Sequence, residues 1–145
     1  MTTILADVAH GVMVSDTLFT DGDRRWTGRK VFRIHGALVG IAGSSRTYLR
    51  LLEALRERRP LSEVWRRNDE AASLLVLRND GLFVYSDSPD AEKVASGREA
   101  VGTGALAAMA VHEALGWSDP KRAVAMAVKH DVNSGAPIRV YKLNP

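Results

Sequence analysis

Residues 30–58, KVFRIHGALVGIAGSSRTYLRLLEALRER, contain the strand-to-helix transition on which the fold prediction depends. The first five residues alternate polar and apolar side chains, which is typical of a half-buried strand, and the nearly continuous apolar run at 37–42 predicts a central strand. Tyrosine and leucine side chains then recur with helical spacing. We therefore expect an amphipathic helix that is capped by the preceding serines and ends near Arg58.

The segments around this stretch favour antiparallel pairing. Residues 2–9 and 12–16 are β-prone runs joined by a glycine-bearing connection, which predicts a hairpin. A second hairpin is expected where 73–77 and 82–85 flank the turn sequence Arg78-Asn79-Asp80-Gly81.

The remaining segments complete the predicted element order. Residues 18–28 and 86–98 are polar and are interpreted as loops. Further helices are expected at 62–71, 104–115 and 120–132, and a closing strand at 138–143. Helical pairs placed between antiparallel strand groups favour an α+β fold with two layered sheets over a parallel winding, in one domain that spans 1–145.

The composition bounds the function classes. The chain has 145 residues, of which 46% are hydrophobic and 26% are charged, as in folded globular proteins. It has no cysteine, so disulfides, thiolate metal sites and a cysteine nucleophile are excluded. The sequence shows no membrane span and no signal peptide, so we expect a cytoplasmic protein. The four histidines have no ligand spacing, and we expect no metal and no cofactor.

The first candidate for chemistry is the start of the chain. An initiator Met1 before a small residue is normally removed, which leaves Thr2 with a free α-amine. A threonine hydroxyl beside its own amine combines a nucleophile and a base. Many chains begin with Met-Thr, however, so this signal needs companions.

Asp16 and Lys30 are the next candidates. A lysine near the amine would lower the amine's pKa by like-charge repulsion and would stabilise developing negative charge. Asp16, at the end of the neighbouring strand, is a suitable partner for that lysine. The alternative is a solvated surface lysine and an ordinary turn aspartate.

Three further motifs can serve either chemistry or plain structure. Backbone N–H groups in Gly40-Ile41-Ala42-Gly43-Ser44 can bind an oxyanion, or the segment is only a strand-to-helix turn. Gly102-Thr103-Gly104 can expose a hydroxyl, or it only opens the next helix. Asp131 and Ser134 can together hold an ammonium or hydroxyl group, or they belong to a common helix C-terminal turn.

Taken in order along the chain, these pieces resemble the proteasome β-type branch of the N-terminal nucleophile (Ntn) hydrolases, which includes the bacterial HslV-type peptidases. The resemblance spans nearly the full length and looks most similar to compact proteasome-like proteins of bacteria and bacteriophages. It is carried by Met1-Thr2-Thr3-Ile4, Ser15-Asp16-Thr17, Arg29-Lys30-Val31, Gly40-Ile41-Ala42-Gly43, Gly102-Thr103-Gly104 and residues 129–135.

The resemblance implies a four-layer αββα sandwich and a threonine-type endopeptidase. Thr2 would be the nucleophile and its amine the base, and Lys30 would tune that amine while Asp16 holds Lys30. The Gly43 amide would bind the oxyanion. Asp131 and Ser134 would position the N-terminus, and Thr103 stands where the family usually has serine. The implied substrate pocket is lined by Phe19, Gly28, Ile41 and Ser45.

The resemblance also implies partners: a homo-oligomeric ring or stacked rings, peptide or unfolded-protein substrates, and an ATPase that unfolds them. The alternative function is a non-catalytic ring or scaffold that keeps the fold without turnover. A third hypothesis is nucleic-acid binding through the arginine clusters at 24–25, 56–59 and 66–67. No interleaving of aromatic and basic residues supports it, and the net charge is only +3.

Overall fold

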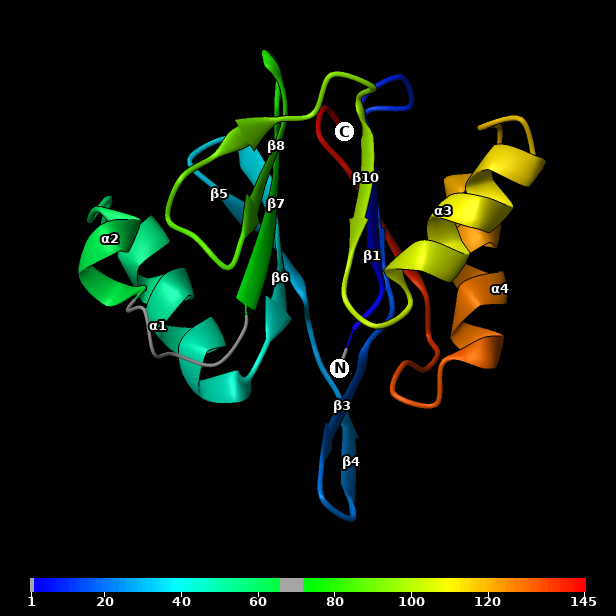
Figure 1. Cartoon of the computed structure of the whole chain (residues 1–145), viewed down its shortest axis with the longest axis horizontal. Helices are drawn as coiled ribbons and strands as arrows, with labels where there is room; N and C mark the ends of the chain where they lie inside the picture. The colour runs from blue at the N-terminus through cyan, green and yellow to red at the C-terminus, as the bar shows by residue number, and fades with distance from the viewer. Residues whose placement is uncertain (1, 66–71) are drawn as a thin grey trace.

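The computed structural model describes residues 2–65 and 72–145, and these form four layers (Figure 1). Two sheets face each other in the middle, α1 and α2 cover the outer face of one sheet, and α3 and α4 cover the outer face of the other. The structure is therefore the predicted α+β sandwich with antiparallel sheets.

The first sheet has four strands and contains the N-terminus. Its spatial order is β10 (Arg98–Val101), β1 (Ile4–Asp7), β2 (Val12–Ser15) and β11 (Arg139–Lys142). Ile4 pairs with Ser15, and the same antiparallel register brings Ser15 opposite Arg139 in β11. The residues that precede β1, follow β2 and precede β11 consequently meet at one end of this sheet.

The second sheet has five strands and contains the segment that decides the fold. Its spatial order is β5 (Val31–Ile34), β6 (Ala37–Gly43), β7 (Ala72–Arg78), β8 (Gly81–Ser86) and β9 (Glu92–Lys93). Six of the seven residues of β6 are buried, as its apolar run predicts, because this strand has a sheet on one face and a helix on the other.

The helices are α1 (Ser45–Arg56), α2 (Leu61–Val64), α3 (Ala105–Ala114) and α4 (Pro120–His130). Ser44 caps α1 by accepting a hydrogen bond from the Thr47 N–H, and Asp119 caps α4 in the same way through the Arg122 N–H. Leu51 and Leu52 of α1 pack on the five-stranded sheet, whereas Ala108 of α3 and Val124 of α4 pack on the four-stranded sheet. None of the helices in the described ranges is long and apolar enough to cross a membrane.

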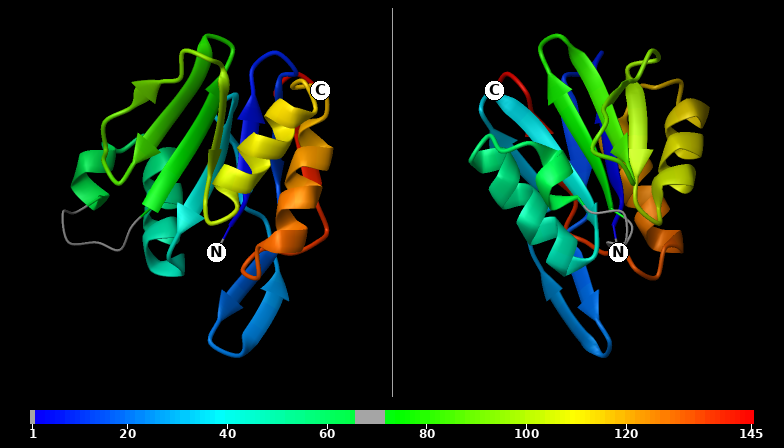
Figure 2. Two further views of the ribbon diagram at one scale, coloured as in Figure 1. Left: turned by 45° about the vertical axis from the view of Figure 1, so that its right-hand side comes forward. Right: turned by 60° about the vertical axis from the view of Figure 1, so that its left-hand side comes forward.

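The structure corrects three predictions. Residues 18–28 are not a loop but a hairpin of β3 (Leu18–Asp21) and β4 (Arg24–Thr27), which projects from the body as a separate two-stranded sheet (Figure 2). No second sheet covers β4, all of whose residues are exposed, so this hairpin lacks the apolar alternation that reveals a half-buried strand.

The second correction concerns residues 86–98, which include the short strand β9 and the start of β10. Both are strands at the edges of their sheets. The two residues of β9 are exposed, and β10 contributes only the half-buried Arg98 to this segment, so neither strand gives it a hydrophobic pattern. The third concerns the helix predicted at 62–71, because α2 ends at Val64 and Trp65 is its C-cap. The rest of that predicted helix, with Arg66 and Arg67, lies outside the described residues.

Candidate active site

The start of β1 and the end of β2 are joined by a pair of backbone and side-chain hydrogen bonds. Thr2 is 5% exposed and Thr3 is fully buried. The Asp16 N–H donates to the Thr3 carbonyl oxygen at 3.1 Å, and the Thr3 N–H donates to Asp16 Oδ1 at 3.0 Å. The β1–β2 register thus places the Asp16 carboxylate one residue away from Thr2.

Lys30, the residue before β5, binds the same carboxylate. Its Nζ lies 2.9 Å from Asp16 Oδ1 and 3.0 Å from Oδ2, and the lysine side chain is only 1% exposed. Burial lowers the pKa of Lys30, and this effect is larger than the increase caused by the Asp16 and Asp131 charges. A solvated surface lysine, the alternative considered from the sequence, is therefore wrong.

Backbone groups hold the carboxylate in place from the other side. Asp16 Oδ2 accepts hydrogen bonds from the Leu18 N–H at 3.2 Å and from the Gly135 N–H at 3.1 Å. With Lys30 and Thr3, four donors surround a carboxylate that is completely buried. Such a carboxylate is fixed in position, and Lys30 is fixed with it.

A second set of hydrogen bonds connects Asp131 to Thr3 through side-chain hydroxyl groups. The Thr103 and Ser134 hydroxyls each donate to Asp131 Oδ2 at 2.6 Å, and Ser134 Oγ lies 2.8 Å from Thr3 Oγ1. Because the Ser134 proton is directed to Asp131, Thr3 is the donor to Ser134. Burial tends to raise the pKa of Asp131, but the hydrogen bonds from Ser134, Thr103 and the Asn133 N–H outweigh it and lower that pKa.

Close contacts with the two N-terminal threonines require glycine at both ends of the Gly102-Thr103-Gly104 motif. Gly102 has φ +97, and a Cβ there would overlap the Thr2 carbonyl oxygen, whereas a Cβ on Gly104 would overlap Thr3 Oγ1. The Gly104 N–H also donates to the Thr2 carbonyl oxygen at 3.3 Å. The two glycines therefore let the chain approach both threonines, and this approach brings the Thr103 hydroxyl to Asp131.

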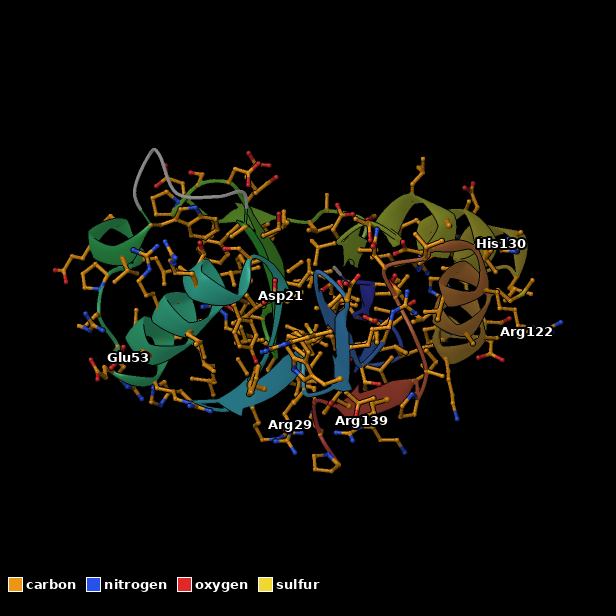
Figure 3. All side chains as sticks on the ribbon, turned by 90° about the horizontal axis from the view of Figure 1, so that it is seen from below. Asp21, Arg29, Glu53, Arg122, His130 and Arg139 are labelled. Carbon is orange, nitrogen blue, oxygen red and sulfur yellow. The ribbon has the colours of Figure 1, made fainter. Side chains whose placement is uncertain are left out.

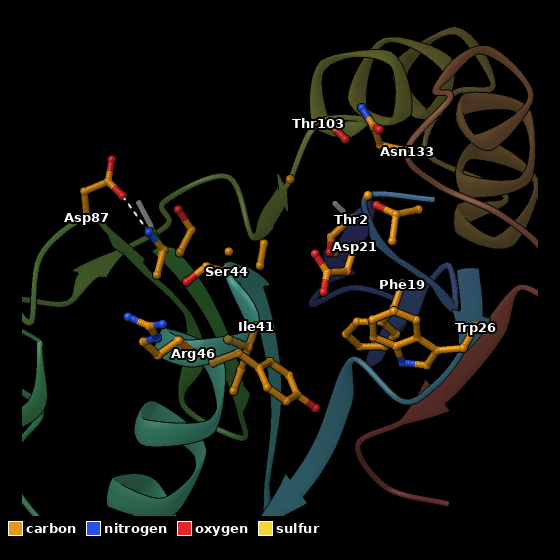
Figure 4. Close-up of a pocket in the computed structure, with 18 residues that line it drawn as sticks. Thr2, Phe19, Asp21, Trp26, Ile41, Ser44, Arg46, Asp87, Thr103 and Asn133 are labelled. Atoms are coloured by element: carbon orange, nitrogen blue, oxygen red, sulfur yellow. Dashed lines mark hydrogen bonds between the residues drawn. The ribbon is translucent and has the colours of Figure 1, made fainter. Parts of the chain in front are cut away.

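Thr2, Gly102 and Thr103 face a cavity of about 890 Å³ (Figure 4). Thr2 and Thr103 lie on one side of it and Ile41 and Ser44 on the other, so both sheets contribute to its walls. The β3–β4 hairpin supplies Phe19 and Trp26, whose rings stack at a centroid distance of 5.8 Å and an angle of 10°. The arrangement offers a hydroxyl nucleophile at one side of a space large enough for an extended peptide.

The structure brings together most of the residues proposed from the sequence. Thr2, Phe19, Ile41, Gly43 and Thr103 line the cavity. Behind them are the bonded residues Asp16, Lys30, Asp131 and Ser134. Gly28 is not in the cavity wall but lies against the Phe19 ring, and the Ser45 side chain is outside what the structure describes.

Sequence reasoning missed several lining residues: Asp21, Trp26, Arg46, Tyr48, Asp87 and Asn133. Asp21 and Trp26 were hidden by the interpretation of 18–28 as a loop. The dipeptide Gly22-Asp23, which connects the paired residues Asp21 and Arg24 as a two-residue hairpin turn, was the signal that could have found them.

A second buried polar cluster lies at the other end of β1. His112 Nε2 is 2.7 Å from Asp7 Oδ2, and both side chains are fully buried. Arg98 Nε lies 3.4 Å from the same oxygen, and the His10 N–H donates to Asp7 Oδ1 at 3.1 Å. Neither Asp7 nor His112 lines the cavity. The sequence analysis did not anticipate this pair.

The arginine clusters that suggested nucleic-acid binding lie on separate elements: Arg24 and Arg25 are on the projecting strand β4, and 56–59 are at the end of α1. Arg66 and Arg67 lie outside the described residues. Other arginines are also distributed over different sides of the molecule. In the view of Figure 3, Arg29 and Arg139 project at one edge, whereas Arg122 projects from the side that carries α4. Arg33 is engaged with the chain itself, because it donates to the carbonyl oxygens of Lys142 and Leu143.

The chain has two antiparallel sheets, each covered by helices, and two threonines precede the first strand at the end where the cavity opens. This arrangement is the HslV-like, proteasome β-type fold of the Ntn hydrolases. Comparison with solved structures gives this class directly. HslV from Trypanosoma brucei is 24% identical, with a TM-score of 0.74 over 97% of this chain and 98% of that one.

The protein BPH from Thiobacillus denitrificans matches in two structures. Its complex with epoxomicin is 18% identical, with a TM-score of 0.77 over 99% of this chain and all of that one. A further BPH structure is 19% identical, with a TM-score of 0.74 over the whole of both chains. The sequence itself matches no protein-family model and no curated protein sequence. At these identities the similarity establishes the fold.

Proposed function

We propose that this chain is a threonine-type endopeptidase subunit of a self-compartmentalising ring, and that Thr2 becomes its nucleophile when Met1 is removed. The observation that carries the proposal is the sharing of one atom: Asp16 Oδ1 accepts hydrogen bonds from both Lys30 Nζ and the Thr3 N–H. This atom holds a buried cation one residue from a threonine hydroxyl at the wall of the cavity.

In the proposed acylation step, the Thr2 hydroxyl proton moves to the α-amine of the same residue while Oγ1 attacks a peptide carbonyl carbon. The carbonyl electron pair moves to its oxygen, and the Gly43 N–H donates a hydrogen bond to that oxyanion. When the carbonyl re-forms, the C–N bond breaks, and the Thr2 ammonium gives its proton to the leaving amine. The product is an ester between Thr2 and the acyl half of the peptide.

Water completes the cycle. The Thr2 amine takes a proton from the water molecule, whose oxygen attacks the ester, and collapse of the second tetrahedral intermediate returns the proton to Oγ1. Lys30 acts as a fixed positive charge that lowers the pKa of the neighbouring amine, so that the amine is neutral near pH 7. Asp131, with Ser134 and Thr103, orients the N-terminal segment through Thr3.

The residues that line the cavity favour peptides or unfolded proteins as substrates. The aromatic pair of the hairpin and Ile41 provide apolar surface, which favours an apolar side chain before the cleaved bond. The ring is proposed because the fold is that of HslV and BPH. An ATPase that unfolds substrates belongs to the same proposal.

The test is the intact mass of the purified protein with and without a peptide epoxyketone, a reagent that closes a ring on both the hydroxyl and the amine of an N-terminal threonine. We expect loss of Met1 and one adduct per chain, and Thr2→Ala should form no adduct and hydrolyse no peptide. Because Thr2→Ala keeps the backbone and Cβ of this residue, the variant should melt close to the wild-type temperature. A protein that has lost Met1 and forms no adduct would contradict the proposal and leave the non-catalytic ring.

A further inference from the structure

The Phe19 ring separates Lys30 from the cavity. Lys30 Nζ lies 5.0 Å from the centroid of the ring, within the range of a cation–π interaction. Phe19 lines the cavity and Lys30 does not. One face of the ring is thus directed to the ammonium group, and the ring forms part of the wall that keeps water away from it.

The neighbours of Phe19 hold the ring in this position. Trp26 stacks on it nearly in parallel, and Tyr48 meets it edge-on at a centroid distance of 6.1 Å. A Cβ on Gly28 would lie 2.8 Å from Phe19 Cε2, so the glycine leaves the space that the ring occupies. Trp26 is 46% exposed, which leaves it accessible from the cavity side of the hairpin.

We propose that Phe19 is a positioning residue for Lys30: its ring excludes water from the Lys30–Asp16 ion pair, and Trp26 keeps the ring in place. The proposal rests on the proposed function, in which Lys30 acts on the Thr2 amine. It assigns a role to the β3–β4 hairpin that goes beyond shaping the cavity.

The effect of the ring follows from electrostatics. The charged groups that face Lys30 are Asp16, after β2, and Asp131, after α4; the Thr2 amine joins them in the processed chain. Water near Lys30 would screen its charge and restore its solvation. Loss of the cation–π contact would lower the pKa of Lys30, but restored solvation outweighs it because burial is the largest influence on that pKa. The pKa of Lys30 would therefore rise toward its ordinary value of 10.5, and the pKa of the Thr2 amine, less repelled by the lysine, would rise as well.

Removal of the Phe19 ring therefore shifts the pH dependence of hydrolysis to higher pH. Hydrolysis needs a neutral amine and a protonated lysine, so both limbs of the pH dependence of kcat move to higher pH in Phe19→Ala. At pH 7 we expect kcat to fall about fivefold because a smaller fraction of the Thr2 amine is neutral, with recovery at higher pH. A loss of packing alone would lower the rate equally at every pH.

The experiment measures the titration of the Lys30 ammonium group directly. Protein that begins with Thr2 and carries lysine labelled with ¹³C at Cε is titrated by NMR, with the Lys30 signal assigned by its absence in Lys30→Met. We expect Lys30 to titrate at higher pH in Phe19→Ala than in the wild type, and the titration of the exposed Lys121 to be unchanged. The matched control is Phe83→Ala, because that ring also carries a cation, Arg78 at 4.2 Å, but does not line the cavity.

Two milder variants keep the test decisive if Phe19→Ala does not fold. Phe19→Leu keeps an apolar cover and should retain most of the wild-type titration, whereas Gly28→Ala displaces the ring and should shift Lys30 in the same direction as its removal. An unchanged Lys30 titration in both Phe19→Ala and Gly28→Ala, or in Gly28→Ala when Phe19→Ala does not fold, would overturn the proposal.

The titration also separates this proposal from the proposed function, because it does not require turnover. If the Lys30 titration shifts but the wild type neither hydrolyses peptides nor reacts with the epoxyketone, the peptidase proposal fails and the role of Phe19 stands. If the wild type hydrolyses peptides and Lys30 titrates alike in all variants, the role of Phe19 fails and the peptidase stands.

Discussion

Each end of β1 carries a buried carboxylate that is bound to a side-chain nitrogen, but the surroundings of the two pairs differ. At one end Asp16 binds Lys30, and at the other Asp7 binds His112, with both carboxylates fully buried and each supported by a backbone N–H. The first pair lies behind a cavity lined by the Thr2 and Thr103 hydroxyls. The second is covered by Trp117, whose ring meets that of His112 edge-on at 5.1 Å.

A buried carboxylate with a bound nitrogen group therefore does not by itself mark an active site. Both pairs link segments that are distant in the sequence, and either would be costly to break. The difference is the neighbouring nucleophile and an open space in front of it. We therefore expect substitutions at the Asp16 end to affect chemistry and substitutions at the Asp7 end to affect stability.

The largest expected effect is on the cation of the first pair. Lys30→Met introduces an uncharged side chain of similar length and so removes the charge beside the Thr2 amine. Turnover should therefore fall about 1,000-fold, within the usual range for loss of base activation. The measurement is the initial rate of peptide hydrolysis at pH 7.5, with circular dichroism to show that the variant is folded. A rate within threefold of the wild type would remove Lys30 from the proposed mechanism.

The next effect concerns the carboxylate of the second pair. Asp7→Asn leaves His112 and Arg98 without a buried anion, and we expect the free energy of unfolding to fall by about 3 kcal/mol in urea titrations. Because Asp7 is at the far end of β1, the rate constant of epoxyketone addition to the folded protein should stay within twofold. A tenfold slower addition would show that the two ends are coupled, against the comparison.

A smaller effect is expected at Thr103, where the serine of the resembling family is replaced. Thr103→Ser keeps the hydroxyl that donates to Asp131, whereas Thr103→Val keeps the shape and loses the donor. Turnover should be nearly unchanged in the serine variant and about tenfold lower in the valine variant, as expected for the loss of a hydrogen bond to a charged group. Equal rates in the two variants would contradict a role of the hydroxyl, and a serine variant slower than the valine variant would show that the methyl group matters instead.

Much of the fold follows from the sequence because its elements are strongly patterned. The apolar run of β6, the helical spacing in α1 and the turn before Gly81 each allow one interpretation, and the structure confirms all three. The β3–β4 hairpin could not be found in this way, since no sheet covers it and its sequence carries no period. Edge strand β10 was missed for a different reason: only Ala100 and Val101 of its four residues are buried, which is too short a run to reveal a strand.

The site was predictable where its residues belong to short motifs, and hidden where it depends on packing. Thr2, Asp16, Lys30 and Asp131 follow from chemical type and order along the chain. The stack of Trp26 on Phe19 and the Asp7–His112 pair depend on contacts between side chains that no local pattern records. The steric reason for Gly102 also appeared only with the structure.

The smallest expected effect is acid sensitivity, to which both ends of β1 contribute. Burial tends to raise the pKa of Asp7, but the hydrogen bonds from His112 and the His10 N–H outweigh it, so that this pKa, like that of Asp131, lies below the ordinary 3.8. A carboxyl whose pKa is lower in the folded state stabilises the fold above its unfolded pKa. That stabilisation is lost as the pH falls below 3.8 through the folded pKa.

The free energy of unfolding should therefore fall with pH below 3.8, at most by about 1.4 kcal/mol per pH unit for each such group. Asp7→Asn and Asp131→Asn should each flatten this dependence, and Asp7→Asn should flatten it more because Asp7 is fully buried. Urea titrations between pH 2.5 and 6 measure the slopes, with Asp90→Asn, an exposed residue in the 86–98 segment, as control. Slopes in both variants that match the control would show that neither end of β1 holds its carboxylate more strongly than the unfolded chain does.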